Sequence, residues 1–222
     1  YRAINSCIRL AHSVDGLALW TVEDLAGADG ALHPAQEAMV QCHGSQCGFC
    51  TPGFVMSLFG MYQNHVCQGE PITRELAQAE LSGNLCRCTG YRPILDAAQQ
   101  MFEVPRAGLD LAPALQALRR IDEGDDSTFV YEAQDAAEPG RRVRFMAPRT
   151  LDELARLRAD LPQARLLAGA TDIGLWVTKQ FRALGDILYL GRVAQLQTIR
   201  PWGPDAARPE GLEISAGASL ED

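Results

Sequence analysis

The sequence has no apolar run that approaches the ~20 residues a membrane-spanning helix needs. Residues 1–10 lack the basic start and apolar core of a signal peptide. Low-complexity tracts and internal repeats are missing too. Lys and Arg number 20 against 28 Asp and Glu, and the net charge of −8 argues against a nucleic-acid surface. We therefore expect a cytoplasmic protein that binds neither membrane nor nucleic acid.

Cysteine stands out in this ordinary composition, with seven in 222 residues, at positions 7, 42, 47, 50, 67, 86 and 88. The odd number argues against a framework of disulfides. Four of them form two tight pairs, Cys47 with Cys50 and Cys86 with Cys88, and 35 residues lie between the pairs. Four thiolates gathered in this way suit an iron–sulfur cluster or a structural zinc ion. The spacing predicts a Cys₄ metal site and does not choose the metal.

The residues that follow each pair favour the start of a helix. Thr51 suits an N-cap and Pro52 the first helical position, and Pro93 can play the same part after the second pair. Helix N-termini carry unpaired N–H groups and a partial positive charge. Both features favour anionic sulfur nearby, and hydrogen bonds to sulfur raise the potential of a cluster.

Each pair lies within a long and specific string, GSQCGFCTPG at 44–53 and GNLCRCTGYRPI at 83–94. Both strings resemble the second [2Fe–2S] domain of the molybdenum hydroxylases, the family of the xanthine dehydrogenases and aldehyde oxidases. The resemblance implies that the cluster nearest the molybdopterin is ligated by Cys47, Cys50, Cys86 and Cys88. It also implies that Cys88 lies beside the pterin and Gln46 near the molybdenum cofactor.

Residues 23–104 are predicted to form the helical [2Fe–2S]-binding domain. Apolar residues at helical spacing predict four helices, at about 34–42, at 52–65, from Thr73, and from about 94 to Phe102. Gly44 is the expected stop of the first helix. Short amphipathic helices with short loops indicate a compact four-helix bundle, with the cysteine pairs in the loops before the second and fourth helices.

Residues 105–140 are predicted to be a linker, with a short helix at 114–120, and residues 141–222 to begin a second domain. Strand and helix alternate in that domain, and the fold class we expect is α+β, a four-helix [2Fe–2S] domain followed by the start of an α+β FAD-binding domain. Thr150 to Glu153 reads as a capping box that starts a helix. Strands are expected at 165–168, 186–190 and 213–218.

A Gly-Ala-Thr-Asp turn at 169–172 follows the strand predicted at 165–168. Such a turn is usually only a turn, and it is not the G-x-G-x-x-G fingerprint. The surrounding residues resemble the first FAD-pyrophosphate loop of the family's flavin domain. The resemblance implies FAD contact by Leu166, Leu167, Ala168, Gly169, Ala170, Thr171, Asp172 and Ile173. Ala170 stands where Gly or Asn is common, and we expect its methyl group to be tolerated with a negative φ.

Residues 1–22 resemble the end of a plant-type [2Fe–2S] ferredoxin domain, in which Cys7 would be the last ligand. That cluster type needs a C-x₄-C-x₂-C run upstream, and the sequence has none. A small buried thiol is the alternative for Cys7. Cys42 and Cys67 match no ligand of the family. We therefore expect one [2Fe–2S] cluster in this chain.

The order of iron–sulfur domains followed by a flavin domain resembles the small subunit of bacterial xanthine dehydrogenases. It implies that electrons pass from a molybdopterin-binding large subunit through [2Fe–2S] clusters to FAD and NAD, in a hetero-oligomer that oxidises hypoxanthine and xanthine to urate. No residue here is expected to be a proton-transfer catalyst. Two alternatives stay open: a related hydroxylase acting on aldehydes or other N-heterocycles, and a non-redox Cys₄ zinc-binding module.

Overall fold

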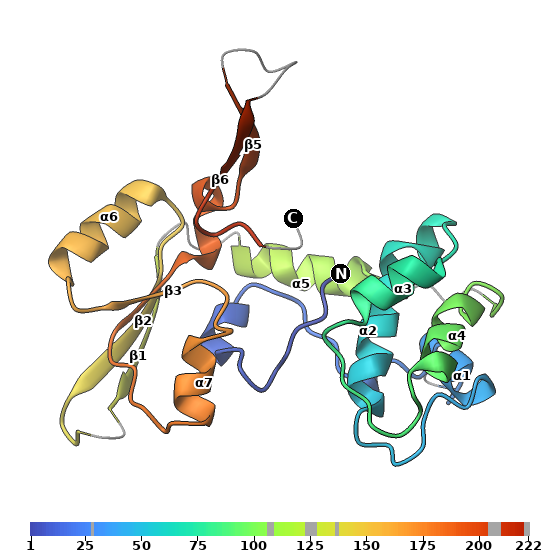
Figure 1. The fold of residues 1–222 in the computed structure, drawn as a ribbon. Coiled ribbons are helices and arrows are strands. Elements are labelled where there is room, and N and C mark those ends of the chain that lie inside the picture. Colours follow the sequence, from blue (N-terminus) through green and yellow to red (C-terminus); the bar gives the residue numbers. More distant parts are fainter. Residues whose placement is uncertain (28, 106–108, 123–127, 136–137, 204–209, 220–222) are drawn as a thin grey trace. The chain divides into compact units, whose positions relative to one another are not determined.

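The computed structural model describes residues 1–27, 29–105, 109–122, 128–135, 138–203 and 210–219 (Figure 1). The chain divides into two compact units. The helical unit comprises Tyr1–Ile4 and Ala18–Leu115, and the sheet unit comprises Asn5–Leu17 and Gln116–Asp222. Helices and strands together give the mixed α/β character that the sequence predicts. Among the described residues, no helix is both long and apolar enough to cross a membrane.

The helical unit holds α1 (Pro34–Gln41), α2 (Thr51–Asn64), α3 (Arg74–Glu80) and α4 (Arg92–Gln100), with short 3₁₀ turns η2 (Val22–Asp24) and η3 (Val66–Gln68). The stretches predicted to be helical are helical, and α4 ends two residues before Phe102. Helix α1 packs against both α2 and α4 (Figure 1). Thr73, from which the sequence predicts the third helix to start, is the N-cap of α3, and its hydroxyl accepts a hydrogen bond from the N–H of Leu76 at 3.2 Å.

Two helix ends differ from the prediction. Cys50, not Thr51, is the N-cap of α2, and the Thr51 hydroxyl instead lies 2.7 Å from that of Ser45. After α1 the left-handed position is taken by His43, with φ of 54°, and not by Gly44. Gly44 is needed for space, because a Cβ there would lie 2.6 Å from the Met39 sulfur.

The core of the helical unit lies along one face of α2. Phe54, Leu58 and Tyr62, spaced four residues apart, are fully buried. Ile94 and Ala97 of α4 belong to the same cluster. Burial of each large apolar side chain contributes roughly 1.5–3 kcal/mol. These contacts fix the start of α2, and therefore the loop that carries the first cysteine pair.

The sheet unit has a four-stranded sheet of β1 (Phe129–Gln134), β2 (Arg142–Ala147), β3 (Arg165–Leu167) and β4 (Ile187–Tyr189), in the order β1-β2-β4-β3. β1 is antiparallel to β2, and β4 is parallel to both β2 and β3. The chain runs from β2 through α6 (Leu151–Asp160) to β3, then through α7 (Ile173–Thr178) to β4 (Figure 1). The carboxyl ends of the three parallel strands therefore share one edge of the sheet.

Several elements fall where the sequence did not predict them. β1 lies within 105–140, the expected linker, and is a full member of the sheet, whereas the short helix predicted there at 114–120 is present as α5 (Ala112–Asp122). β6 (Gly211–Ile214) begins before the strand expected at 213–218 and pairs with the unpredicted β5 (Ile199–Trp202) as a separate hairpin. The remaining short turns are η1 (Ala11–Val14), η4 (Leu190–Arg192) and η5 (Ala194–Leu196).

The capping box at the start of α6 is only half formed. The Thr150 hydroxyl accepts from the N–H of Glu153 at 3.2 Å. The Glu153 carboxylate accepts from the N–H of Arg149 and from the Thr128 hydroxyl, not from the N–H of Thr150. The second half of the box therefore links α6 to the start of β1.

A segment from the amino end of the chain packs on the sheet unit. Arg9 donates to the Tyr189 hydroxyl at 3.0 Å, and Arg192 pairs with Asp15. The Ile8 backbone approaches Gly174 of α7 so closely that a Cβ there would lie 2.5 Å from the Ile8 carbonyl oxygen. Glycine at 174 is therefore a requirement of packing.

His33 caps α1 from inside the core. Its Nδ1 accepts a hydrogen bond from the N–H of Ala35 at 3.1 Å, and its ring meets Phe59 and Tyr62 edge-on. The residue is only 4% exposed. Burial lowers the pKa of His33 to about 4, because the charged ring would be poorly solvated.

We expect stability of the helical unit to fall with acidification because of His33. The folded pKa of about 4 lies below the ordinary 6.5, so the contribution is fully present above pH 6.5 and is lost as pH falls toward 4. The slope from this one group is at most ~1.4 kcal/mol per pH unit. Urea unfolding at several pH values measures it. His33→Asn keeps a capping oxygen without a titrating ring and should flatten this part of the profile; an unchanged profile would contradict the assignment.

Gly174→Ala should destabilise the sheet unit, by ~1–3 kcal/mol, because the new methyl group displaces the Ile8 backbone. The matched control is Gly60→Ala in α2, where nothing lies within 4 Å of the added Cβ. There the same substitution should stabilise by roughly 0.5–1 kcal/mol through helix propensity. Thermal unfolding measures whether each variant unfolds at a lower or a higher temperature than the parent chain. A higher unfolding temperature for Gly174→Ala would show that the Ile8 contact is not maintained.

Candidate functional site

The first cysteine pair lies in the loop between α1 and α2. Gly48, with φ of 84°, makes the turn between the two thiols. Cys47 is exposed and Cys50 is half-buried at the N-cap of α2. A hydrogen bond from the backbone N–H of Phe49 lowers the pKa of Cys47, whereas burial raises the pKa of Cys50. The turn therefore presents two thiols with different tendencies to ionise.

The second pair lies in the loop before α4. Cys86 is buried and Cys88 is exposed. The Thr89 hydroxyl lies 3.3 Å from the Cys86 sulfur, and the N–H of Cys88 donates to the same sulfur at 3.4 Å. These contacts, led by the Thr89 hydroxyl, lower the pKa of Cys86 to about 7. The contact with Cys47 raises the pKa of Cys88.

The two loops meet, and their thiols contact each other across the loops. The Cys88 thiol donates to the Cys47 sulfur at 3.4 Å. Burial first, and then interaction with the Cys86 thiol, raises the pKa of Cys50. A distance of 3.4 Å is far longer than the ~2.05 Å of a disulfide, and all seven cysteines are free. The four predicted ligands are therefore brought together as two cross-loop pairs, Cys47 with Cys88 and Cys50 with Cys86.

The cross-loop pairs do not form a ready single-ion site. In the part of the chain that the structure describes, no three His, Cys, Asp or Glu side chains converge closely enough to hold one metal ion. A tetrahedral zinc site needs all four thiolates around one centre. A binuclear iron–sulfur centre also uses four thiolates, and each of its irons can take one pair.

The other residues singled out from the sequence differ in their exposure. Gln46 is exposed beside Cys47. Cys7 belongs to the sheet unit, where it is exposed and donates its N–H to the Asn5 side chain at 3.1 Å. Cys42 and Cys67 are half-buried against the helical core.

The predicted flavin loop follows β3 at the carboxyl edge of the sheet. Thr171 and Asp172 are exposed, while Leu167 and Ala170 pack in the core of the sheet unit. The expectation of a negative φ at Ala170 is wrong: its φ is +68°, in the left-handed region that favours Gly or Asn. The Ala170 carbonyl accepts the N–H of Gly174 at 2.8 Å, so the strained residue leads directly into α7.

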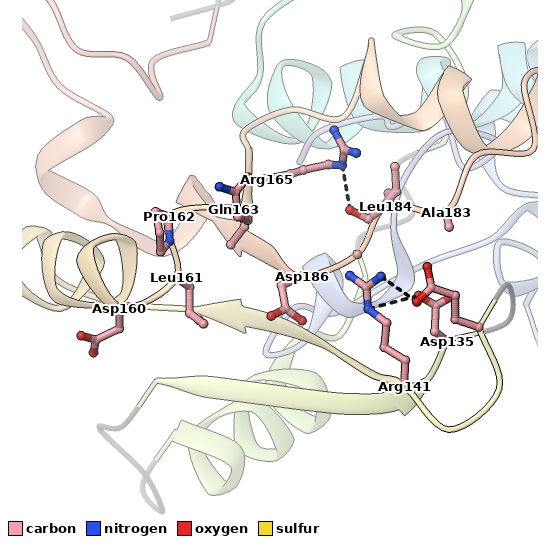
Figure 2. Close-up of a pocket in the computed structure, with 13 residues that line it drawn as sticks. Asp135, Arg141, Asp160, Leu161, Pro162, Gln163, Arg165, Ala183, Leu184 and Asp186 are labelled. Atoms are coloured by element: carbon pink, nitrogen blue, oxygen red, sulfur yellow. Dashed lines mark hydrogen bonds and ion pairs between the residues drawn. The ribbon is translucent and has the colours of Figure 1, made fainter.

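A cavity of about 480 Å³ opens at the opposite edge of the sheet, where β2, β3 and β4 begin (Figure 2). Arg141 pairs with Asp135 at 3.8 Å and with Glu138 at 3.2 Å. Figure 2 also shows Arg165, whose Nε donates to the Leu184 carbonyl at 2.7 Å. None of the lining residues belongs to the cysteine loops or the flavin loop. Sequence reasoning missed this cavity because its lining comes from stretches far apart in the chain.

Comparison with known proteins identifies two redox-cofactor domains. Residues 21–99 match the [2Fe-2S] binding domain, and residues 141–222 match the FAD binding domain in molybdopterin dehydrogenase. Xanthine dehydrogenase of Drosophila subobscura is 31% identical over an alignment of 229 residues that covers 89% of this chain and 17% of that protein. Aldehyde oxidase 1 of Rattus norvegicus is 30% identical over 256 residues, covering 100% of this chain and 18% of that protein.

Among solved structures, quinoline 2-oxidoreductase from Pseudomonas putida 86 is 32% identical, covering 53% of this chain and 62% of its own. Its TM-score of 0.39 is too low to define how the units are arranged. The matched domains and the sequence relatives define an iron–sulfur flavoprotein with an electron-transfer role. The two matched domains and the relatives support the molybdenum hydroxylase family, and the chain spans about a sixth of the length of the curated relatives it matches.

Proposed function

We propose that the chain is the electron-transfer subunit of a xanthine dehydrogenase, with a [2Fe–2S] cluster held by Cys47, Cys50, Cys86 and Cys88. The observation that carries this proposal is the meeting of four free thiols as two cross-loop pairs within a domain that matches the [2Fe-2S] binding family. When bound, such a cluster accepts and releases single electrons.

The described residues fit the cluster in three ways. Each cross-loop pair offers two sulfurs to one iron, and each pair contains one thiol with a lowered pKa. Metal binding requires deprotonated thiolates, so this distribution favours loading of both irons. Cys50 is also the N-cap of α2, whose dipole favours negative charge at that end.

In this proposal the chain carries electrons from a molybdopterin-binding large subunit, with Gln46 and Cys88 on the side facing the pterin, to FAD and then NAD during oxidation of hypoxanthine and xanthine to urate. FAD would lie against Leu166–Ile173, because this loop follows a parallel strand at the carboxyl edge of the sheet, where nucleotides bind in open α/β sheets. Cys7 would ligate a separate ferredoxin-type cluster. Aldehyde oxidation is the second candidate, since the aldehyde oxidase relative is as similar as the xanthine dehydrogenase.

Iron content tests the cluster directly. The chain, reconstituted with ferrous iron and sulfide, should hold about two irons and absorb visible light. Cys86→Ser should lose most of that iron and colour, because it removes one ligand and leaves its partner Cys50 alone. Cys67→Ser is the matched control and should keep both. A colourless chain that binds zinc would contradict the redox function, and about four irons would show that Cys7 has partners in this chain.

Two exposed apolar side chains support the proposal that a partner protein binds to the cysteine loops. Phe49 is 95% exposed between Cys47 and Cys50, and Leu85 is 80% exposed immediately before Cys86. Large apolar side chains left in water beside a redox centre favour a protein contact. The relatives extend far beyond the stretch matched here, and we propose that the molybdopterin-binding subunit covers Phe49 and Leu85.

Phe49→Ser and Leu85→Ser should each weaken binding of the molybdopterin subunit roughly tenfold, because truncating an apolar anchor typically costs more than ~1 kcal/mol. Titration calorimetry between the separated subunits measures this, with iron content confirming that the cluster is intact. Phe181→Ser is the control, since Phe181 is 88% exposed but lies in the sheet unit. Equal weakening by all three variants, or none by the first two, would rule out this contact.

A further inference from the structure

Tyr91 adopts a backbone conformation that a bulky residue rarely takes. It is the N-cap of α4, with φ of 69° and ψ of −27°, directly after Gly90, whose φ is also 69°. A left-handed conformation is uncommon outside Gly, Asn and Asp, and for an aromatic residue it is a true outlier. Such strain costs roughly 1–3 kcal/mol and persists only where surrounding contacts enforce it. The contacts of Tyr91 should therefore explain why the strain is kept.

The Tyr91 hydroxyl reaches back to the second cysteine pair. The backbone N–H of Cys86 donates to Tyr91 Oη at 2.9 Å. At the other end of the same residue, the N–H of Tyr91 donates to the Thr89 hydroxyl at 3.2 Å. That hydroxyl lies 3.3 Å from the Cys86 sulfur. Tyr91 therefore contacts Cys86 in two ways. Its hydroxyl binds the Cys86 backbone directly, and its N–H binds the Thr89 hydroxyl that lies next to the Cys86 sulfur.

The Tyr91 ring connects this arrangement to the first cysteine pair. It packs edge-on against Phe54, with ring centroids 6.2 Å apart and planes at 68°. Phe54 is fully buried in the first turns of α2, and its N–H donates to the carbonyl of Cys50 at 3.1 Å. One side chain therefore links Cys86, by its hydroxyl, to the helix that begins at Cys50, by its ring.

We propose that Tyr91 is the positioning residue that sets Cys86 opposite Cys50, and so fixes the geometry of the inner half of the cluster site. The inference rests on the proposed cluster ligation by these cysteines. The strained backbone belongs to this arrangement, because the turn at Gly90 and Tyr91 leads into the residue whose hydroxyl contacts the loop before it. Tyr91 itself supplies no ligand, since its hydroxyl is occupied by the Cys86 N–H.

Tyr91→Phe tests this role, because it removes the hydroxyl and keeps both the ring against Phe54 and the backbone turn. In the full chain reconstituted with ferrous iron and sulfide, the variant should still take up iron. The electron paramagnetic resonance spectrum of its reduced cluster should change, since the freed Cys86 no longer has one fixed orientation. Release of iron to a chelator should accelerate about fivefold, the effect expected from losing one net hydrogen bond.

The control is Tyr62→Phe, which removes a hydroxyl from a fully buried side chain in the same helical core. It should alter thermal stability while leaving the spectrum and the rate of iron release at their parent values. If Tyr91→Phe also leaves both unchanged while the parent chain holds its cluster, the positioning role is wrong and the proposed function stands. If the parent chain binds no iron, the proposed function fails, and this inference fails with it.

Discussion

Apolar packing of the helices is the constraint that brings together sulfurs from two loops, 41 residues apart in the chain. A thiol–thiol contact contributes little energy by itself, so the loops must be brought together by the helices behind them. Helix α1 packs against both α2 and α4, and the buried faces of α2 and α4 share one core. The thiols therefore lie where the apolar packing of three helices places the starts of α2 and α4.

Much of this could be predicted from the sequence, because the relevant signals are local. Paired cysteines, the prolines after them and apolar residues at helical spacing identify the four thiols and the helices that follow them. The cross-loop pairing could not be predicted, because spacing suggests that Cys47 acts with Cys50, whereas the structure pairs Cys47 with Cys88. The role of Tyr91 could not be predicted from the sequence either. Its left-handed backbone and its hydrogen bond to Cys86 are set by tertiary contacts and not by residue type.

The sheet unit shows where local reasoning is weakest. The strand β1 was not predicted, because the segment around it is rich in charged residues. Its position is set by antiparallel pairing with β2 and not by a strong apolar pattern of its own. Ala170 is in the left-handed conformation although Gly or Asn would adopt it more easily, because its methyl group is buried beside Leu167 and Tyr189. Burial of a methyl group offsets part of the backbone cost, since both are on the order of 1 kcal/mol.

Exposure divides the four thiols in a way that bears on electron transfer. Cys47 and Cys88 form an outer pair, both exposed, whereas the inner pair has Cys86 buried and Cys50 half-buried at the core. A binuclear cluster held by these pairs would be asymmetric, with one iron near solvent and one near the apolar interior. Burial and hydrogen bonding tune the potentials of iron–sulfur centres. The outer pair also lies in the loops that carry Gln46, Phe49 and Leu85, so the iron most accessible to a partner would be the one at the surface that the partner contacts.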